Sequence, residues 1–181
     1  MGHAARAACA ETHLWGDLSE HQRFRNLFRR GTEALHQGEI AKAIRSLERA
    51  HKLEPQHVDA ALNLAAAYIL SKQFSQAAGI LEPLADHDPA NPMVWTNLGA
   101  ARLGNPVTAT EQDQRQAIEA FQRAYELNPA TPHVAYNLGL IYRDRGEKEK
   151  ALHWLRRALQ ANPADRDAQA LIQRMAPEEG S

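Results

Sequence analysis

The chain repeats a pattern of prolines and small residues along most of its length. Four segments end in a proline, at Pro55, Pro89, Pro129 and Pro163, with spacings of 34, 40 and 34. Four alanines, at Ala43, Ala77, Ala117 and Ala151, have the same spacings. A third series, Gly31, Ala65, Gly99 and Gly139, has spacings of 34, 34 and 40, so six extra residues lie between Gly99 and Ala117. A period of this length predicts a stack of similar units that bury their faces against one another.

Each unit reads as two amphipathic helices. In the second helix an alanine is followed four residues later by a large apolar residue and three residues after that by a small or apolar one, as in Ala151, Leu155 and Ala158. Offsets of four and three place these side chains on one helical stripe. The small residues let two helices approach closely, and the proline ends the second helix because it cannot continue one without losing a hydrogen bond. No run of alternating β-branched residues predicts a sheet, so we expect an all-α fold.

This pattern resembles the tetratricopeptide repeat, a 34-residue helix–turn–helix unit. The resemblance implies a right-handed superhelical solenoid of four units, which cover residues 24–57, 58–91, 92–131 with the six-residue insertion, and 132–165. An apolar stripe over 166–175 predicts a capping helix, which completes a repeat domain over residues 20–175. We expect tails at 1–19 and 176–181. Pro83 stands late in a second helix and should kink or shorten it.

In this family the first helix of each pair lines the concave side of the superhelix. Asn63, Asn97 and Asn137 occupy the same phase of this helix in three consecutive units. An amide both donates and accepts hydrogen bonds, as does a peptide backbone, so a ladder of asparagines suits an extended peptide of any sequence. The alternative is that asparagine is simply common here, or that it ties neighbouring helices together. We expect further peptide contacts from other residues on the first helices of the four units: Phe28, Arg29, Leu62, Met93, His133, Tyr136 and Leu140.

Charge is unevenly distributed although the whole chain carries only −1. Residues 21–52 hold eight basic and three acidic residues, a net of +5, whereas residues 53–113 hold two basic and seven acidic residues, a net of −5. The simplest interpretation is a solvated face with pairs such as Glu48 and Lys52. The functional alternatives are an acidic partner that docks on the first unit and head-to-tail association of copies.

No motif for catalysis, metal binding or phosphate binding occurs. HExxH, GxxxxGK[ST], GxGxxG and GxSxG are all absent, so we expect a protein that is not an enzyme and has no catalytic residues, metal site or cofactor. The balanced charge argues against a nucleic acid partner, although helical repeats of similar length can read RNA. No run of about 18 apolar residues predicts a membrane span. One cysteine, Cys9, is compatible with a reducing compartment and favours the cytoplasm.

The pattern therefore predicts a scaffold or adaptor that binds a protein or peptide in its concave groove, with a self-assembling homo-oligomer as the main alternative. Two segments outside the repeat pattern are candidates for regulating the binding of a partner. Trp15 and Leu18 stand in a polar N-terminal segment, where we expect them to pack on the first helix or, alternatively, to occupy a groove as a pseudo-ligand. The insertion, Gly104–Thr110, is either neutral or a rim contact for a partner.

Overall fold

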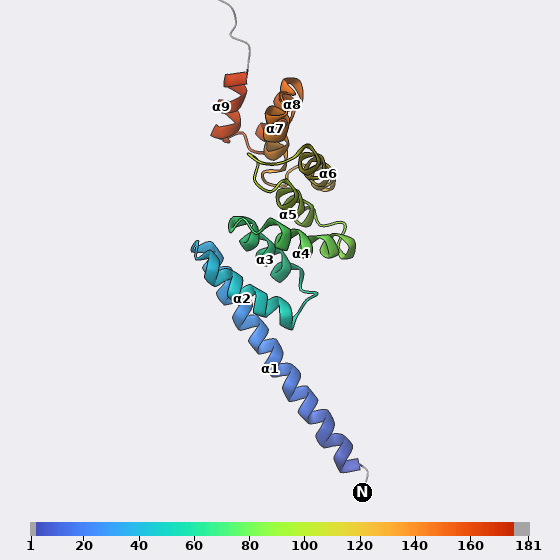
Figure 1. Ribbon diagram of the computed structural model, residues 1–181. Helices are drawn as coiled ribbons and strands as arrows, with labels where there is room; N and C mark the ends of the chain where they lie inside the picture. The colour runs from blue at the N-terminus through green and yellow to red at the C-terminus, as the bar shows by residue number, and fades with distance from the viewer. Residues whose placement is uncertain (1–2, 176–181) are drawn as a thin grey trace, which may run out of the picture. The chain divides into compact units, whose positions relative to one another are not determined.

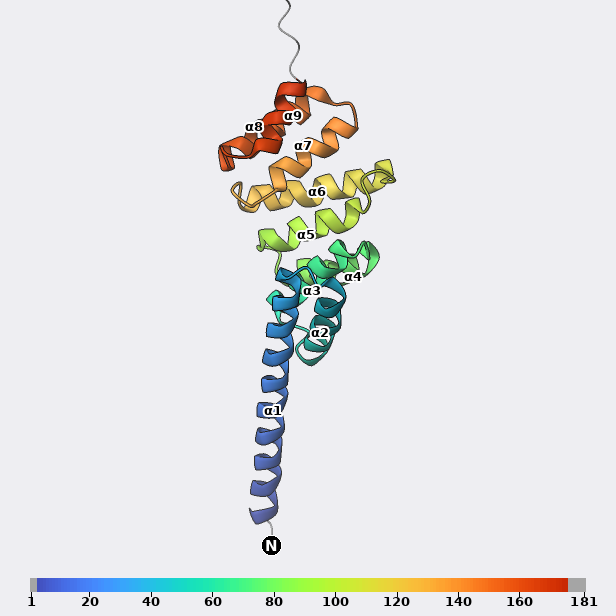
Figure 2. The same ribbon diagram turned by 90° about the vertical axis from the view of Figure 1, so that its left-hand side faces the viewer.

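The structure is a computed structural model that describes the backbone of residues 3–175 and the side chains of residues 19–175. These residues form nine α-helices and contain no strand (Figures 1 and 2), so the prediction of an all-α fold is confirmed. The chain divides into two compact units, Met1–Gln73 and Phe74–Ser181. The boundary falls between the two helices of the repeat predicted over 58–91.

The first unit holds a helical hairpin and one further helix, α1 (His3–His36), α2 (Ile40–Leu53) and α3 (Val58–Leu70). Helix α2 lies along the C-terminal half of α1 (Figure 1) and packs on its other side against α3. Phe24, Ala50 and Ala60, one from each helix, form a buried cluster. The predicted stripe of small residues thus joins these three helices.

Helix α1 begins much earlier than the sequence pattern indicated. Residues 1–19 were expected to form a tail, but α1 already begins at His3 and continues to His36. Five alanines between residues 4 and 10 account for this difference, because alanine has the highest helix propensity and needs no repeat pattern to form a helix. The side chains of Cys9, Trp15 and Leu18 lie outside the described residues, and so does the predicted C-terminal tail.

The second unit is a sequence of six helices. Each packs against the next along the chain, and Figure 2 shows α5, α6 and α7 as successive layers. The helices are α4 (Phe74–His87), α5 (Pro92–Leu103), α6 (Glu111–Leu127), α7 (Val134–Asp144), α8 (Lys148–Ala161) and α9 (Arg166–Met175).

Close approach of paired helices depends on glycine. A Cβ atom added at Gly99 of α5 would lie 2.9 Å from the ring of Phe121 on α6, and one added at Gly139 of α7 would lie 2.8 Å from the side chain of Leu155 on α8. Such distances are too short for nonbonded carbon atoms. The steric role that the sequence predicted for the small residues is therefore confirmed at both hairpins.

The six-residue insertion is shared between a loop and a helix. The connection between α5 and α6 covers residues 104–110, and α6 has 17 residues where α2 and α8 have 14. Thr110 starts α6 with a capping box, in which its hydroxyl accepts from the Asp113 N–H at 3.2 Å and the Asp113 carboxylate accepts from the Thr110 N–H at 2.8 Å. The longer helix therefore has its own start signal.

Pro83 does not shorten its helix. Helix α4 continues past it to His87, so this alternative of the prediction is wrong. Leu84 and Ala85, which follow the proline, are both buried. Their packing holds the last turn of α4 although the proline cannot donate a backbone hydrogen bond.

The final helix, α9, occupies the residues expected for the capping helix. It packs against α8, and its Ala168 is fully buried in a cluster with Leu155 and Ala158. Leu171, Ile172 and Met175 lie partly buried around this cluster. The apolar stripe of α9 thus packs against α8 and joins a cluster that also includes Ala135 of α7.

Candidate functional site

In the first repeat, an arginine takes the place of the asparagine that the next three repeats share. One repeat before Asn63, Arg29 of α1 stands at the position that Asn63, Asn97 and Asn137 share. Its side chain is exposed and pairs with Glu33 one turn later, at 3.0 Å between Nη1 and Oε1. An exposed pair of this kind contributes little to stability, so it can exchange readily for a ligand carboxylate.

Asn63 has a structural partner. Its Nδ2 donates a hydrogen bond of 3.0 Å to Oγ1 of Thr32, which ties α3 to α1. This contact matches the alternative interpretation, in which the asparagine joins neighbouring helices. No hydrogen bond within the described residues involves Asn63 Oδ1, so this oxygen can still accept one from a bound peptide.

Asn97 on α5 and Asn137 on α7 differ from Asn63 in this respect. Both side chains are half-buried, and neither has a hydrogen-bond partner within residues 19–175. The residue that corresponds to Thr32 one repeat before Asn137 is Ala100, which has no hydroxyl to offer. These two amides therefore retain both donors and the acceptor for a ligand.

The predicted apolar contacts have different degrees of exposure. Met93, one turn before Asn97 on α5, is 42% exposed. Leu62 on α3 and Leu140 on α7 are half-buried. Met93 therefore offers the most apolar surface beside an asparagine, and its flexible thioether suits variable ligands.

Phe28 takes part in the packing of the first unit. Its ring stacks on Phe24 at 5.7 Å between centroids and contacts His57 at 5.2 Å, so it forms the edge of the core there. Aromatic contacts of this kind stabilise the packing beyond the area they bury. The side chain is half-buried, so only part of the ring is left for a ligand.

His133 and Tyr136 meet in a pocket of about 300 Å³ at the start of α7. The pocket lies between the α6–α7 connection, the end of α8 and the α8–α9 connection, and Asp165 also lines it. Burial raises the pKa of Tyr136 above its ordinary value, and the carboxylates of Asp167 and Asp165 add to this effect while Arg143 opposes it. The phenol therefore stays protonated to a higher pH than that of an exposed tyrosine.

The backbone at this pocket is strained. His133 has a φ of 64°, in the left-handed region that side chains other than glycine rarely adopt. It caps α7 without a side-chain hydrogen bond, whereas at the start of α5 the side chain of Asn91 accepts from the N–H of Met93. Strain of this kind often occurs at binding sites. Sequence reasoning missed Asp165 here, because only the fold brings the α8–α9 connection to α7.

The described part of the chain offers no metal centre and no membrane-crossing segment. No group of three or more histidine, cysteine, aspartate or glutamate side chains lies close enough to hold a metal ion. Among the same residues, every helix is too short or too polar to cross a bilayer.

Family models described as tetratricopeptide repeat match this chain twice, over residues 34–101 and 111–166. The two matches together cover more than half of the chain. They divide at residues 102–110, the region of the six-residue insertion.

Two curated relatives are transcriptional corepressors. General transcriptional corepressor trfA of Dictyostelium discoideum is 30% identical over 116 residues, which are 63% of this chain and 8% of that protein. General transcriptional corepressor ssn6 of Schizosaccharomyces pombe is 27% identical over 124 residues, or 67% of this chain and 11% of that protein. The chain therefore spans about a tenth of the length of these relatives.

Several solved structures share the fold. TTC0263, a tetratricopeptide-repeat protein of Thermus thermophilus, matches with a TM-score of 0.73 and 22% identity over 84% of this chain and 80% of that one. MamA matches with a TM-score of 0.69 and 24% identity over 85% and 81%. The first tetratricopeptide domain of Spaghetti (RPAP3), bound to the HSP90 peptide SRMEEVD, matches with a TM-score of 0.60 and 22% identity over 69% and 94%. The predicted helical repeat fold is thereby confirmed.

Proposed function

Because this chain belongs to the tetratricopeptide-repeat family, we propose that it binds a peptide or protein segment along the first helices of its repeats and acts as a scaffold or adaptor. Proteins of this family are generally interaction modules without enzymatic activity. The RPAP3 domain, which was solved with a bound HSP90 peptide, is an example of the fold in this role.

The observation that carries this proposal is the pair of unpartnered amides in the second unit. Asn97 and Asn137 stand at the same repeat position on two first helices, and neither is engaged by the described part of the chain. Partial burial removes some of the hydrogen bonds that an amide makes to water, and a bound peptide backbone can replace them. Met93 beside Asn97, and Tyr136 and Leu140 beside Asn137, add apolar contacts that select among peptides.

A peptide selection tests this proposal. Random peptides displayed on phage are first selected for binding to the wild-type chain. The affinity of each selected peptide is then measured for wild type and for the variant Asn97→Ala/Asn137→Ala. We expect affinity to fall about tenfold, since two hydrogen bonds of roughly 0.5–1.5 kcal/mol each are lost. Circular dichroism shows whether the variant is folded.

The matched control is Gln122→Ala/Gln173→Ala, which removes two amides from α6 and α9 instead of from α5 and α7. Peptides should bind this control as they bind wild type. If the selected peptides bind wild type and Asn97→Ala/Asn137→Ala equally well, the peptide does not contact these two asparagines. Growth in size with concentration, with no peptide selected, would instead favour the self-assembling array, and sedimentation measures this directly.

A further inference from the structure

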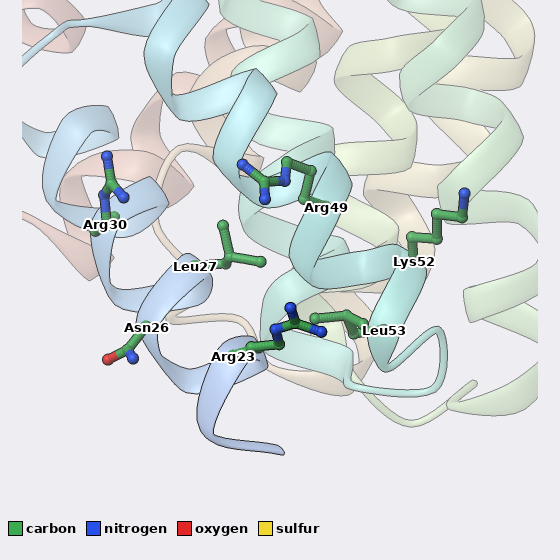
Figure 3. Close-up of a pocket in the computed structure, with 7 residues that line it drawn as sticks. All are labelled: Arg23, Asn26, Leu27, Arg30, Arg49, Lys52 and Leu53. Atoms are coloured by element: carbon green, nitrogen blue, oxygen red, sulfur yellow. The ribbon is translucent and has the colours of Figure 1, made fainter. Parts of the chain in front are cut away.

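A groove with basic walls and an apolar floor runs between α1 and α2 (Figure 3). It has a volume of about 620 Å³, and Leu27 of α1 and Leu53 of α2, both half-buried, form its floor. Figure 3 shows the guanidinium of Arg49 extending from α2 toward α1, with Arg30 and Lys52 on opposite sides of it. The charged residues that line the groove are Arg23, Arg30, Arg49 and Lys52.

These four cations have no carboxylate partner within the described part of the chain, although several carboxylates of the first unit are engaged elsewhere. Glu48 of α2 accepts a hydrogen bond of 2.7 Å from Tyr68, Glu54 pairs with His21 at 2.7 Å, and Glu33 pairs with Arg29. Four like charges around one groove repel one another. A ligand that brings negative charge relieves this repulsion.

The repeat register explains why this groove is open. One repeat before Leu64, Arg30 stands at the position that later units fill with Leu64, Leu98 and Leu138, each no more than 2% exposed. In the second unit Leu138 of α7 lies in one buried cluster with Phe121 and Ala124 of α6. The corresponding side of a later repeat is thus covered by the helix before it, whereas the first repeat presents arginine there.

We propose that this groove binds an amphipathic helix of a partner protein, whose apolar stripe contacts Leu27 and Leu53 and whose aspartates or glutamates pair with Arg23, Arg30, Arg49 and Lys52. The occupant is a helix because a helix fills the corresponding place against α7. It is acidic because the walls are basic, and guanidinium groups bind carboxylates through two parallel hydrogen bonds. This inference does not rest on the asparagine surface.

The distance between the arginines of α1 predicts where acidic residues occur in the sequence of the partner helix. Arg23 and Arg30 are seven residues apart, so they lie about 10 Å apart along the helix axis. An acidic residue repeated at every seventh position of the partner matches them, with apolar residues three and four positions away. A nucleic acid would have no use for the leucine floor, since phosphate contacts need only the charges.

A model peptide tests the proposal on the full chain. The probe is a fluorescent peptide long enough for about five helical turns and made of alanine, leucine and glutamate, with one leucine stripe flanked by glutamates. Fluorescence anisotropy measures its binding.

We expect Arg30→Gln/Arg49→Gln to weaken binding of this peptide at least tenfold. Lys148→Gln/Arg156→Gln removes the same charge from two exposed side chains of α8 that have no carboxylate partner within residues 19–175, and this variant should bind within about twofold of wild type. Asn97→Ala/Asn137→Ala should also bind as wild type does, which separates this groove from the surface of the proposed function.

Other outcomes would overturn the proposal. One is equal binding of a peptide in which lysine replaces every glutamate. Another is tighter binding of a single-stranded or duplex oligonucleotide that depends on the same arginines, since this would mark a nucleic acid surface. A third is a change in the oligomeric state of Arg30→Gln/Arg49→Gln together with no binding of the acidic peptide, because the groove would then join copies of this chain.

Discussion

Asn63 donates a hydrogen bond of 3.0 Å to the hydroxyl of Thr32, and this bond connects α3 to α1 across 31 residues of sequence. The two later asparagines at the same repeat position have no such partner within the described residues. One ladder position therefore supports the packing of the first unit, and two are available to a ligand.

Replacing Thr32 with valine should weaken the first unit. Thr32→Val keeps the shape of the side chain but removes the acceptor for Asn63, and we expect the free energy of unfolding to fall by about 1 kcal/mol. Urea denaturation measures this. If the lost bond is the cause, Thr32→Val/Asn63→Ala should be no less stable than Asn63→Ala alone, and an additive loss would contradict this explanation.

Glycine at residue 72 should stabilise the protein. Lys72 has a φ of 62° and stands one repeat after Gly38, which has a φ of 73° at the corresponding turn. Glycine adopts this conformation without strain, so Lys72→Gly should raise the free energy of unfolding by roughly 0.5–1 kcal/mol. Thermal denaturation should show a higher Tm.

The opposite change at Gly146 is the control for this prediction. Gly146 has a φ of 74°, and no atom lies within 4 Å of an added Cβ, so Gly146→Ala isolates the effect of the backbone. We expect it to lower the free energy of unfolding by about 1 kcal/mol. A rise in stability of Gly146→Ala would show that the turn does not require the left-handed conformation.

Alanine at Gly99 should disturb the α5–α6 hairpin. The added Cβ would lie 2.9 Å from the ring of Phe121, which is fully buried and cannot move away freely. We expect Gly99→Ala to lower the free energy of unfolding by roughly 1–3 kcal/mol, as overpacking of a core typically does. Gly79→Ala is the matched control, because an added Cβ there has open space and alanine favours the helix, so stability should rise.

Stability at high pH should depend on Tyr68. Burial, together with the hydrogen bond to Glu48 and the charge of that carboxylate, raises the pKa of Tyr68 to about 12. The unfolded chain ionises this phenol near pH 10, so the stability that the neutral phenol contributes is complete below pH 10 and is lost as the pH rises toward 12. The loss should be on the order of 1–2 kcal/mol after allowance for solvent near the hydroxyl.

The measurement compares wild type with Tyr68→Phe by urea denaturation between pH 8 and pH 12. Wild type should lose more stability than the variant over the upper part of this range. Parallel curves would mean that folding does not raise the pKa of Tyr68.

The repeat landmarks made the helical hairpins predictable. Glycines at Gly99 and Gly139, and large apolar residues 22 and 16 positions later at Phe121 and Leu155, describe the contact between paired helices directly in the sequence. This information is local to one unit and recurs in each, so the fold follows from the spacing. The shortening expected at Pro83 was wrong, because helix propensity says nothing about the packing of the residues beyond the proline.

The candidate sites were harder to predict, because they depend on contacts between segments. Nothing in the sequence around Asn63 indicates that Thr32 is within reach. The pocket of Tyr136 needs Asp165 from a different connection, and the left-handed backbone of His133 departs from the helix start that the similar sequence around Pro92 adopts. The charge of the first unit was visible in the sequence, but its concentration on one groove required both α1 and α2.

The long connection between α5 and α6 gives the protein a place to vary. Thr110 and Asp113 cap α6 on their own, and Val107 within the connection is 91% exposed. The cap of α6 begins after this exposed residue, so insertions at Val107 should leave the hairpin intact. An affinity tag or a fluorophore inserted at Val107 should therefore leave α5 and α6 folded.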